Sequence, residues 1–462
     1  MNVRQPHEAF SPAFLQDQRL LLEADEDGWL CRADQKLSAE VESLLRVACP
    51  GRLTVHYLDS ASWHRFADTP REREAADDDQ AEIVAWVGDL LREAVHQGAS
   101  DIHLEPRLDC LQVRFRLDGR LQVKRTFGLE YRDALNSRIK VLADLDIAEK
   151  RRPQDGKIQM NVAGRAVDFR VSTIPTGKGE KVVIRVLDQS QSRPSIAGLG
   201  MPAAVETAFA QSVRRPHGLV LVTGPTGSGK TTTLYAALQE IRGDHLNITT
   251  IEDPIEYQID GINQSQVRPG IGFGFSEALR SFLRQDPNVI MVGEIRDGET
   301  ADMSIRASLT GHLVFSTLHT NSAPGAVPRL IDIGAEAYLV ASSLQLVIAQ
   351  RLVRRLCPRC LAEDDAVASK NARFPAEEKV TGTYWIPRGC RECKETGYRG
   401  RLGVFEALTV DRRVREVIHD GSGEPALQAA DAAYRPMLHH GLALAGARET
   451  SLDELLREVV MH

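Results

Sequence analysis

The segment Gly224–Thr231, Gly-Pro-Thr-Gly-Ser-Gly-Lys-Thr, constrains the fold of this chain more than any other part of it. It matches the pattern G-x-x-x-x-G-K-[ST], follows the apolar run 219–222 and precedes a segment with helical character at 231–241. A glycine-rich turn between a strand and a helix N-terminus presents backbone N–H groups that bind phosphate. The segment therefore predicts a nucleotide site; the alternative is a turn that merely connects a strand to a helix.

The side chains of this loop have expected roles in binding MgATP. Lys230 is expected to reach the β- and γ-phosphates, and the Thr231 hydroxyl to ligate Mg²⁺. ATP and Mg²⁺ are thus the predicted cofactors of this site. The predicted nucleotide-binding residues are Gly224, Pro225, Thr226, Gly227, Ser228, Gly229, Lys230, Thr231 and Thr232.

Acidic residues follow two further apolar runs and supply candidates for catalysis. Glu252 follows the run 248–251, and Glu294 follows the run 289–292. Ligands of a doubly wound sheet bind at the carboxyl ends of its strands, so both side chains can point toward the phosphates. We expect Glu294, at the Walker B position, to hold Mg²⁺ through water and Glu252 to orient or deprotonate the attacking water. The two roles are exchangeable on sequence grounds, and a helix cap or solvated loop is the alternative for each.

Two histidines, His312 and His319, flank the next apolar run, 313–315. Taken singly, each is expected to be a structural histidine. Because they flank a strand near the nucleotide, the hypothesis for the pair is that they sense the γ-phosphate, with His319 the catalytic candidate.

The apolar runs 219–222, 248–251, 289–292 and 313–315 are short and separated by helix-length segments, which predicts a parallel sheet covered by helices. Upstream, 101–105 and 111–117 alternate like strands, the second ending in an Asp118-Gly119 turn. Together with candidates at 167–171 and 182–186, they suggest a second, mixed sheet. The first 65 residues suggest a small α/β module, and the charged stretch 68–82 suggests a solvated linker.

The composition narrows the class of protein. A chain of 462 residues is long enough for two or three domains. Its formal charge of -7 gives no general reason to bind nucleic acid or an anionic membrane surface. No stretch approaches the roughly 20 apolar residues of a membrane-spanning helix, and the N-terminus lacks the apolar run of a signal peptide. A cytoplasmic protein is expected, with any membrane contact made through protein partners.

Four of the seven cysteines form two C-x-x-C pairs: Cys357 with Cys360, and Cys390 with Cys393. Four thiolates are the ligand set of a closed tetrahedral Zn²⁺ site, although free or redox cysteines remain an alternative on spacing alone. Such a site stabilises structure and has no open position for catalysis. A nucleic-acid-binding zinc finger is the rival, and the acidic segment 363–365 argues against it. The remaining cysteines, predicted as small core residues, are Cys31, Cys49 and Cys110.

Taken together, these motifs resemble the secretion ATPases of type II secretion systems and type IV pili, most closely the type II secretion motor. The resemblance covers nearly all of residues 98 to 455. It rests on ordered segments at 98–106, 114–119, 152–156, the phosphate-binding loop, 251–254, 292–297, 310–319 and the tetracysteine element with 397–401.

The resemblance implies a multidomain α/β fold. The implied parts are a small N-terminal docking domain (1–75), a PAS-like α/β domain (80–188), a linker (189–202) and a RecA-like P-loop ATPase domain (203–462) that includes a zinc element (357–397). It implies that Arg170 and Arg185 reach the γ-phosphate from the smaller domain, where a delocalised cation stabilises transferred charge. Strand-surface arginines are the alternative. Arg280 and Arg284 match further arginines, implied at a subunit interface.

The implied activity is ATP hydrolysis in a homohexameric ring that drives pseudopilus assembly and export across the outer membrane. The implied partners are a bitopic docking protein and a polytopic platform protein of the inner membrane, without nucleic acid. A type IV pilus extension ATPase is the closest alternative. A DNA-translocating ring motor and a catalytically silent nucleotide-binding scaffold are further alternatives.

Overall fold

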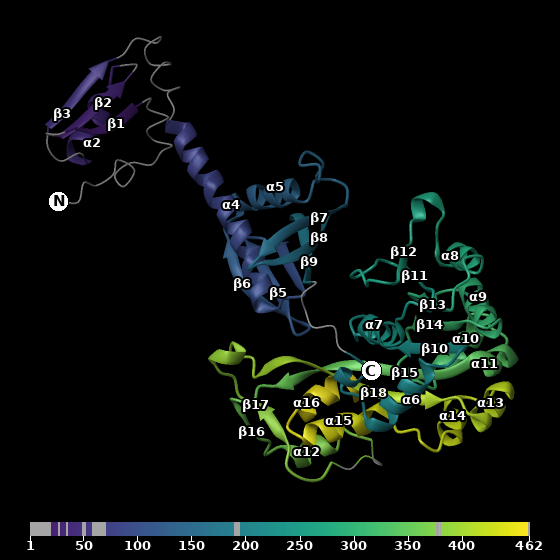
Figure 1. Ribbon diagram of the computed structural model, residues 1–462. Coiled ribbons are helices and arrows are strands. Elements are labelled where there is room, and N and C mark those ends of the chain that lie inside the picture. Colours follow the sequence, from purple (N-terminus) through teal and green to yellow (C-terminus); the bar gives the residue numbers. More distant parts are fainter. Residues whose placement is uncertain are drawn as a thin grey trace. The chain divides into compact units, whose positions relative to one another are not determined.

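The computed structural model describes residues 20–25, 28–33, 36–48, 52–57, 71–188, 195–375, 378 and 380–460 (Figure 1). The chain divides into two compact units, 1–90 and 91–462. The division falls inside one helix, α4 (Arg71–Gln97). The predicted α/β class is confirmed.

The first unit contains a three-stranded sheet of β1 (Leu20–Asp25), β2 (Gly28–Ala33) and β3 (Arg52–Tyr57), with helix α2 (Ala39–Ala48) between β2 and β3. Strands β1 and β2 are antiparallel, and β2 and β3 are parallel. The small core includes Cys31 and Leu45, both fully buried. Cys31 is thus the core residue that the sequence predicts, whereas Cys49 lies outside the described residues.

The prediction of a linker at 68–82 is wrong from Arg71 onward, because α4 begins there and continues for 27 residues. Glu, Ala, Arg and Gln in this stretch all favour helix, so a helix forms although the stretch lacks large apolar residues. Farther along α4, Val87, Leu91 and Ala94 recur at helical spacing and are buried. Gly98, with φ of 68°, ends the helix as predicted.

The second unit begins with a six-stranded sheet in the order β6-β5-β4-β9-β8-β7. Helix α5 (Arg132–Leu142) follows β6 along the chain. Every pairing in this sheet is antiparallel, so the prediction of a mixed sheet is wrong. Short connections such as the Asp118-Gly119 turn allow only antiparallel neighbours. The strands are β4 (Asp101–Pro106), β5 (Leu111–Leu117), β6 (Arg120–Phe127), β7 (Gln154–Val162), β8 (Arg165–Thr176) and β9 (Gly179–Asp188).

A seven-stranded sheet in the order β12-β11-β13-β14-β10-β15-β18 forms the centre of the remaining chain (Figure 1). All pairings are parallel except that between β15 and β18. The four apolar runs predicted as parallel strands lie in β10, β11, β13 and β14. The strands are β10 (Gly218–Thr223), β11 (Ile248–Glu252), β12 (Asn263–Gln266), β13 (Val289–Val292), β14 (Leu313–Leu318), β15 (Leu344–Leu356) and β18 (Tyr398–Thr409).

Both faces of this sheet are buried, as expected for parallel strands covered by helices. Val220 and Val222 face a core with α6 (Ala203–Ser212) and α7 (Lys230–Ile241). Leu219 and Leu221 face the other core. The helices that contribute to this second core are α8 (Phe275–Phe282), α9 (Gly298–Leu309), α10 (Ala326–Asp332), α11 (Ala337–Ser343), α13 (Arg412–His419), α14 (Glu424–Ala430), α15 (Met437–Gly446) and α16 (Leu452–Leu455).

A small element between β15 and β18 contains β16 (Leu361–Glu363), α12 (Val367–Asn371) and β17 (Trp385–Pro387), with β16 and β17 paired antiparallel. The predicted linker 189–202 includes a short helical turn, η3 (Ala197–Leu199), and its residues 189–194 lie outside the described ones. Among the described residues, no helix is both long and apolar enough to cross a bilayer. The three predicted domain boundaries stay predictions.

Candidate nucleotide site

The phosphate-binding loop lies between the end of β10 at Thr223 and the start of α7 at Lys230. Gly224 has φ of 145° and Gly229 has φ of 89°, which are backbone conformations that residues other than glycine rarely adopt. A Cβ atom at Gly224 would lie 2.3 Å from the backbone oxygen of Gln350. Glycine is therefore required both by backbone conformation and by the close approach of β15.

The Gln350 side chain holds this loop from the neighbouring strand β15, where it is 2% exposed. Its Nε2 donates to the Ser228 carbonyl oxygen at 2.7 Å, and its Oε1 accepts from the Thr233 hydroxyl at 2.7 Å. One amide thus joins the loop to the first turn of α7. The sequence does not single out Gln350, which directly follows the apolar run 346–349 and precedes a second polar residue, Arg351.

The Lys230 ammonium lies within the loop, where it donates to the carbonyl oxygens of Gly224 at 2.8 Å and Pro225 at 3.0 Å. Burial lowers the pKa of Lys230 to about 8, and the negative charge of Glu294 opposes that shift. The partly buried cation is therefore placed beside a carboxylate at the end of another strand.

Glu252, the last residue of β11, is 3% exposed. Its Oε1 accepts from the Thr250 hydroxyl at 2.6 Å and from Gln264 Nε2 at 3.0 Å, and its Oε2 accepts from the Tyr235 hydroxyl. Burial raises the pKa of Glu252, and these three hydrogen bonds oppose the rise. Sequence reasoning found Glu252 and missed its donors, which lie on three different elements.

Glu294 lies two residues beyond β13, with its Oε1 2.5 Å from Arg296 Nη2 and its Oε2 3.2 Å from His319 Nε2. Burial acts to raise the pKa of Glu294, but Arg296 and His319 outweigh it, and the pKa is lowered. The structure thus brings together Glu294, His319 and Lys230, as the sequence predicts for the ends of neighbouring parallel strands.

The two histidines do not form a pair. His319 follows the end of β14, whereas His312 precedes the start of the same six-residue strand. His312 Nδ1 lies 2.9 Å from the Ala307 carbonyl oxygen and 3.3 Å from the Thr310 hydroxyl, in the turn after α9. The hypothesis that both sense the γ-phosphate is therefore wrong for His312, because a strand length separates it from the loop.

A cleft of about 790 Å³ in the second unit brings the candidates onto one surface. It is lined by the loop residues 226–232, Glu252, Glu294 and His319, and also by Asp101 and Arg185. Arg185 is mostly exposed, with its Nε 3.3 Å from Asp101 Oδ1. Arg185 therefore lies on the nucleotide cleft, and its role there stays a prediction.

Arg170, the other arginine implied by the resemblance, contacts the loop that follows Glu252. Its guanidinium donates to the Ile255 carbonyl oxygen at 2.5 Å and lies 3.6 Å from Glu256 Oε2. The contact places a cation of β8 against the segment that leads away from the buried carboxylate.

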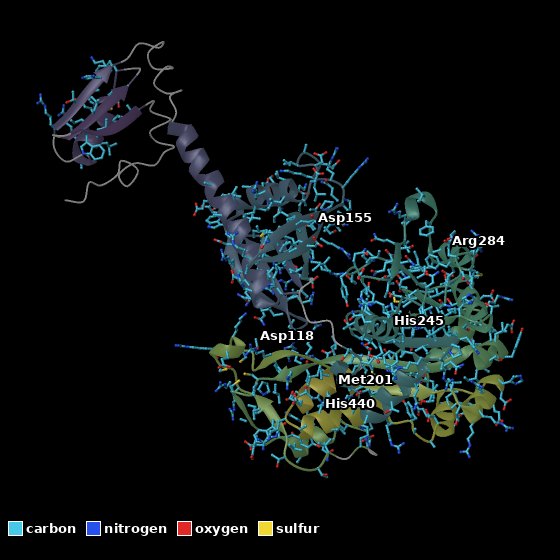
Figure 2. The ribbon with its side chains drawn as sticks, in the orientation of Figure 1. Asp118, Asp155, Met201, His245, Arg284 and His440 are labelled. Carbon is cyan, nitrogen blue, oxygen red and sulfur yellow. The ribbon has the colours of Figure 1, made fainter. Side chains whose placement is uncertain are left out.

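Arg280 and Arg284 are exposed near the C-terminal end of α8, and Figure 2 labels Arg284. Arg280 pairs with Glu299 and lies 3.7 Å from Glu277, whereas Arg284 donates to the Arg280 carbonyl oxygen at 2.8 Å. Helix α8 ends at Phe282, so Arg284 follows the helix instead of sharing its face with Arg280. Their predicted place at a subunit interface stays a prediction.

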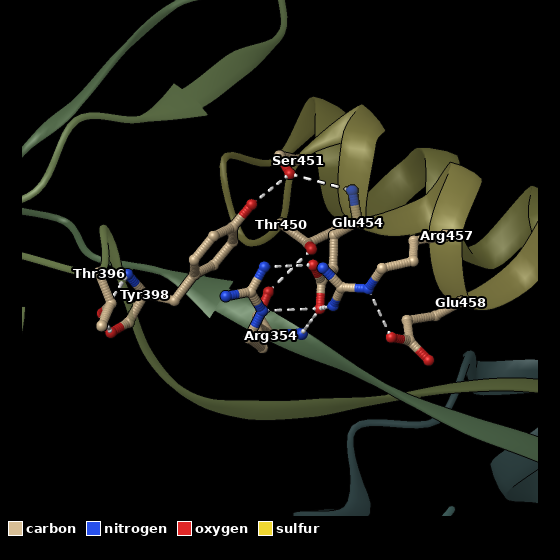
Figure 3. A network of polar contacts seen from close by, with 8 residues as sticks. All are labelled: Arg354, Thr396, Tyr398, Thr450, Ser451, Glu454, Arg457 and Glu458. Carbon is tan, nitrogen blue, oxygen red and sulfur yellow. Dashed lines mark hydrogen bonds and ion pairs between the residues drawn. The ribbon is translucent and has the colours of Figure 1, made fainter. Parts of the chain in front are cut away.

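A buried ion pair joins β15 to the C-terminal helices at another part of the cleft lining (Figure 3). The Arg354 guanidinium contacts both carboxylate oxygens of Glu454, at 3.0 and 2.8 Å, and lies 3.8 Å from the centre of the Tyr398 ring. Arg457 donates to Glu454 at 2.5 Å and to Glu458 at 2.7 Å. The network fixes α16 against the wall of the cleft.

Replacing Glu454 with glutamine should lower the free energy of unfolding of this domain by about 3 kcal/mol, because Arg354 would remain buried without its counter-ion. The side chains of Arg354 and Glu454 are 11% and 1% exposed. Urea denaturation measures the change. Glu449→Gln is the matched control: its pair with Arg355 is 33% and 53% exposed and should contribute less than about 1 kcal/mol. Equal losses in both variants would contradict the prediction.

The four predicted cysteines meet in the element between β15 and β18. Their sulfur atoms all lie within 4.8 Å of one another, with the pairs Cys357–Cys390, Cys360–Cys393 and Cys390–Cys393 at 3.9, 3.7 and 3.6 Å. Zn–S bonds of about 2.3 Å in a tetrahedron place sulfur atoms about 3.8 Å apart, so the four thiols fit Zn²⁺. Burial opposes ionisation of Cys393, but the N–H groups of Cys390 and Gly397 outweigh it and lower its pKa to about 7.

Comparison with known proteins gives one family and close relatives. The family described as "Type II/IV secretion system protein" matches residues 76–457. The "Type II secretion system ATPase E" of Vibrio cholerae is 49% identical over 381 residues, which cover 82% of this chain and 76% of that protein. The "Type IV pilus assembly ATPase PilB" of Myxococcus xanthus is 48% identical, covering 77% of this chain and 63% of that protein.

Among solved structures, the pilus retraction motor PilT with bound ADP is similar, with a TM-score of 0.54 and 26% sequence identity. The similarity covers 80% of this chain and 95% of the motor.

Proposed function

The chain belongs to the family of type II/IV secretion system proteins, and on that basis we propose that it hydrolyses MgATP to drive a type II secretion apparatus. The observation that supports hydrolysis is the convergence on one cleft of Lys230, Glu252 and Glu294. A nucleotide-binding scaffold would need only the phosphate-binding loop. The two carboxylates at strand ends beside that loop supply the groups that hydrolysis needs in addition, one to hold Mg²⁺ and one to orient the attacking water.

In this mechanism the loop N–H groups and Lys230 bind the β- and γ-phosphates, and Thr231 and Glu294 hold Mg²⁺, which neutralises phosphate charge. Glu252 orients the attacking water and accepts its proton as the oxygen bonds to the γ-phosphorus and the bond to ADP breaks. Among the described residues, the hydrogen-bond donor to Oε2 is the Tyr235 hydroxyl, so one lone pair of this oxygen remains for water. His319 contacts Glu294 and is suited to sensing the γ-phosphate through it.

Arg170 and Arg185 belong to the antiparallel sheet and act from outside the seven-stranded sheet. Guanidinium groups stabilise the negative charge that spreads over the transferred phosphoryl group. We propose that closure of the smaller domain brings them to the γ-phosphate. Hydrolysis would then be coupled to domain movement, which a mechanical enzyme requires.

The proposed assembly is a homohexamer in the cytoplasm, bound peripherally to the inner membrane. The N-terminal part would bind a bitopic docking protein and the ring a polytopic platform protein, without nucleic acid. The four cysteines would hold one structural Zn²⁺ per chain. A type IV pilus extension motor is the second candidate, favoured by the similarity to the Myxococcus protein. Identifying the inner-membrane protein that co-purifies with residues 1–80 distinguishes the two.

Phosphate release from an enforced hexamer tests the proposal. The wild-type ring should hydrolyse ATP, and Lys230→Ala should reduce the rate to background, because it removes the cation that binds the β- and γ-phosphates. Lys157→Ala, an exposed lysine on β7, is the matched control and should retain activity. A wild-type rate no higher than that of Lys230→Ala would contradict hydrolysis. Turnover that depends on DNA would favour the translocating motor.

A further inference from the structure

A tyrosine hydroxyl is buried against Glu252. Tyr235 lies on α7, four residues and therefore about one helical turn beyond Thr231, and it is 0% exposed. Its hydroxyl donates to Glu252 Oε2. The helix that begins at the phosphate-binding loop thus also contacts the carboxylate at the end of β11.

Each polar side chain of this cluster has a hydrogen bond to the carboxylate, and Gln264 Nε2 also donates to the Tyr257 carbonyl oxygen at 3.1 Å. Gln264 Nε2 donates to Glu252 Oε1 at 3.0 Å and to the Tyr235 oxygen at 3.3 Å. Because the phenol oxygen accepts from Gln264, its own hydrogen is directed to Glu252 Oε2. The Thr250 hydroxyl donates to Oε1 at 2.6 Å. Gln264 Nε2 can only donate, and both hydroxyls can donate to the same carboxylate, so the cluster fits an ionised carboxylate, which only accepts.

Among the described residues, the strongest influences on the Glu252 carboxylate do not include a cation. Tyr235 on α7 and Glu256 after β11 are its titratable neighbours, and Thr250 and Gln264 are neutral. Burial and the Glu256 charge both raise the pKa of Glu252. Neutral hydrogen bonds therefore carry the stabilisation of its negative charge, and the loss of one is expected to be measurable.

We propose that Tyr235 is the positioning residue of Glu252: its hydroxyl keeps the carboxylate ionised and directed to the cleft where Lys230 and Glu294 meet. The inference rests on the proposed role of Glu252 in hydrolysis. It assigns a function in catalysis to a core residue that is not part of the cleft lining. The phenol ring of Tyr235 packs in the core, and its hydroxyl stabilises the negative charge of the Glu252 carboxylate.

The same domain contains a matched pair away from the cleft. Tyr434 donates to Glu406 Oε2 at 3.1 Å, and Glu406 is also buried, with backbone N–H donors from Ala323 and Met437. Glu406 does not line the cleft. Tyr434→Phe therefore deletes a tyrosine–glutamate hydrogen bond that is buried like the bond between Tyr235 and Glu252 but lies away from the nucleotide cleft.

The experiment compares Tyr235→Phe and Tyr434→Phe in enforced hexamers by the pH dependence of kcat. Tyr235→Phe should shift the acid limb up by about one pH unit, and so lower kcat about tenfold at pH values on that limb, because Glu252 protonates more readily without the donor. The KM for ATP should stay within about threefold, since the ring and the phosphate contacts remain. Gln264→Met, which removes another donor to the same carboxylate, should shift the limb in the same direction.

A readout without turnover separates this inference from the proposed function. The ¹³C signal of carboxyl-labelled Glu252, assigned by its absence in Glu252→Gln, should titrate at a higher pH in Tyr235→Phe than in wild type and Tyr434→Phe. If the wild-type ring does not hydrolyse ATP, the proposed function is overturned. The inference about Tyr235 can still be decided in that case, because the NMR titration midpoint of Glu252 is measured without turnover. The inference is overturned if Tyr235→Phe changes neither the NMR titration midpoint of Glu252 nor the acid limb of kcat. It is also overturned if Tyr434→Phe shifts both by the same amount as Tyr235→Phe.

Discussion

Replacing Glu252 with glutamine should slow ATP hydrolysis by about 10²- to 10⁴-fold while leaving MgATP affinity nearly unchanged. Glutamine keeps the size of the side chain but cannot accept a proton from the attacking water. Its amide nitrogen would also face donors, because Tyr235, Thr250 and Gln264 all point hydrogen atoms at this position. Single-turnover phosphate release and fluorescent-nucleotide titration measure the two quantities.

Two further variants, a control and a comparison, test whether the effect of Glu252→Gln is specific to the role of Glu252. Glu416→Gln, an exposed glutamate on α13, should leave both quantities unchanged. Glu294→Gln should instead raise the Mg²⁺ concentration needed for half-maximal activity, because Glu294 is expected to hold the metal ion. If Glu294→Gln lost turnover at saturating Mg²⁺ and Glu252→Gln retained it, the two roles would be exchanged.

Replacing Cys390 with serine should reduce the bound zinc from about one ion per chain to near zero, because a closed structural site needs all four thiolates. The segment of β16, α12 and β17 packs Phe374, Val380 and Tyr384 into a large core, and the metal is expected to add folding energy at the cysteine end of this segment. The midpoint of thermal unfolding of this element should fall, and limited proteolysis should cut between the cysteine pairs. Metal analysis by mass spectrometry gives the stoichiometry.

Cys110→Ser is the control for this variant. Cys110 is a half-buried cysteine in the connection between β4 and β5, outside the four-cysteine cluster, so its loss should leave zinc content and protease resistance unchanged. Full zinc content in Cys390→Ser would contradict the assignment. A fall in both variants would indicate a general effect of cysteine loss.

Local pattern predicts those parts of the fold in which one physical requirement dominates. Parallel strands buried on both faces must be apolar runs, so 219–222, 248–251 and 289–292 were identifiable. The glycines of the loop satisfy backbone conformations that other residues rarely adopt, and the motif follows from that. The stretch after residue 70 was predicted as a linker and is a helix, because a helix and a linker that are both rich in charged residues have similar compositions.

Sheet partners could not be derived in the same way. Strand patterns at 101–105, 167–171 and 182–186 indicate which residues alternate but not which strands are neighbours or how they run. The structure decides that all five pairings are antiparallel. His312 illustrates the same limit, because flanking a strand does not say at which end the ligand binds.

The sequence by itself determined the phosphate-binding loop, the two acidic strand ends and the four cysteines, because each depends on residue types at fixed local spacing. Only the tertiary structure decided what surrounds them. Tyr235, Gln264 and Gln350 approach the site from three different elements, a helix and two strands. Their contacts depend on side-chain distances in a packed core, and a linear pattern does not carry that information.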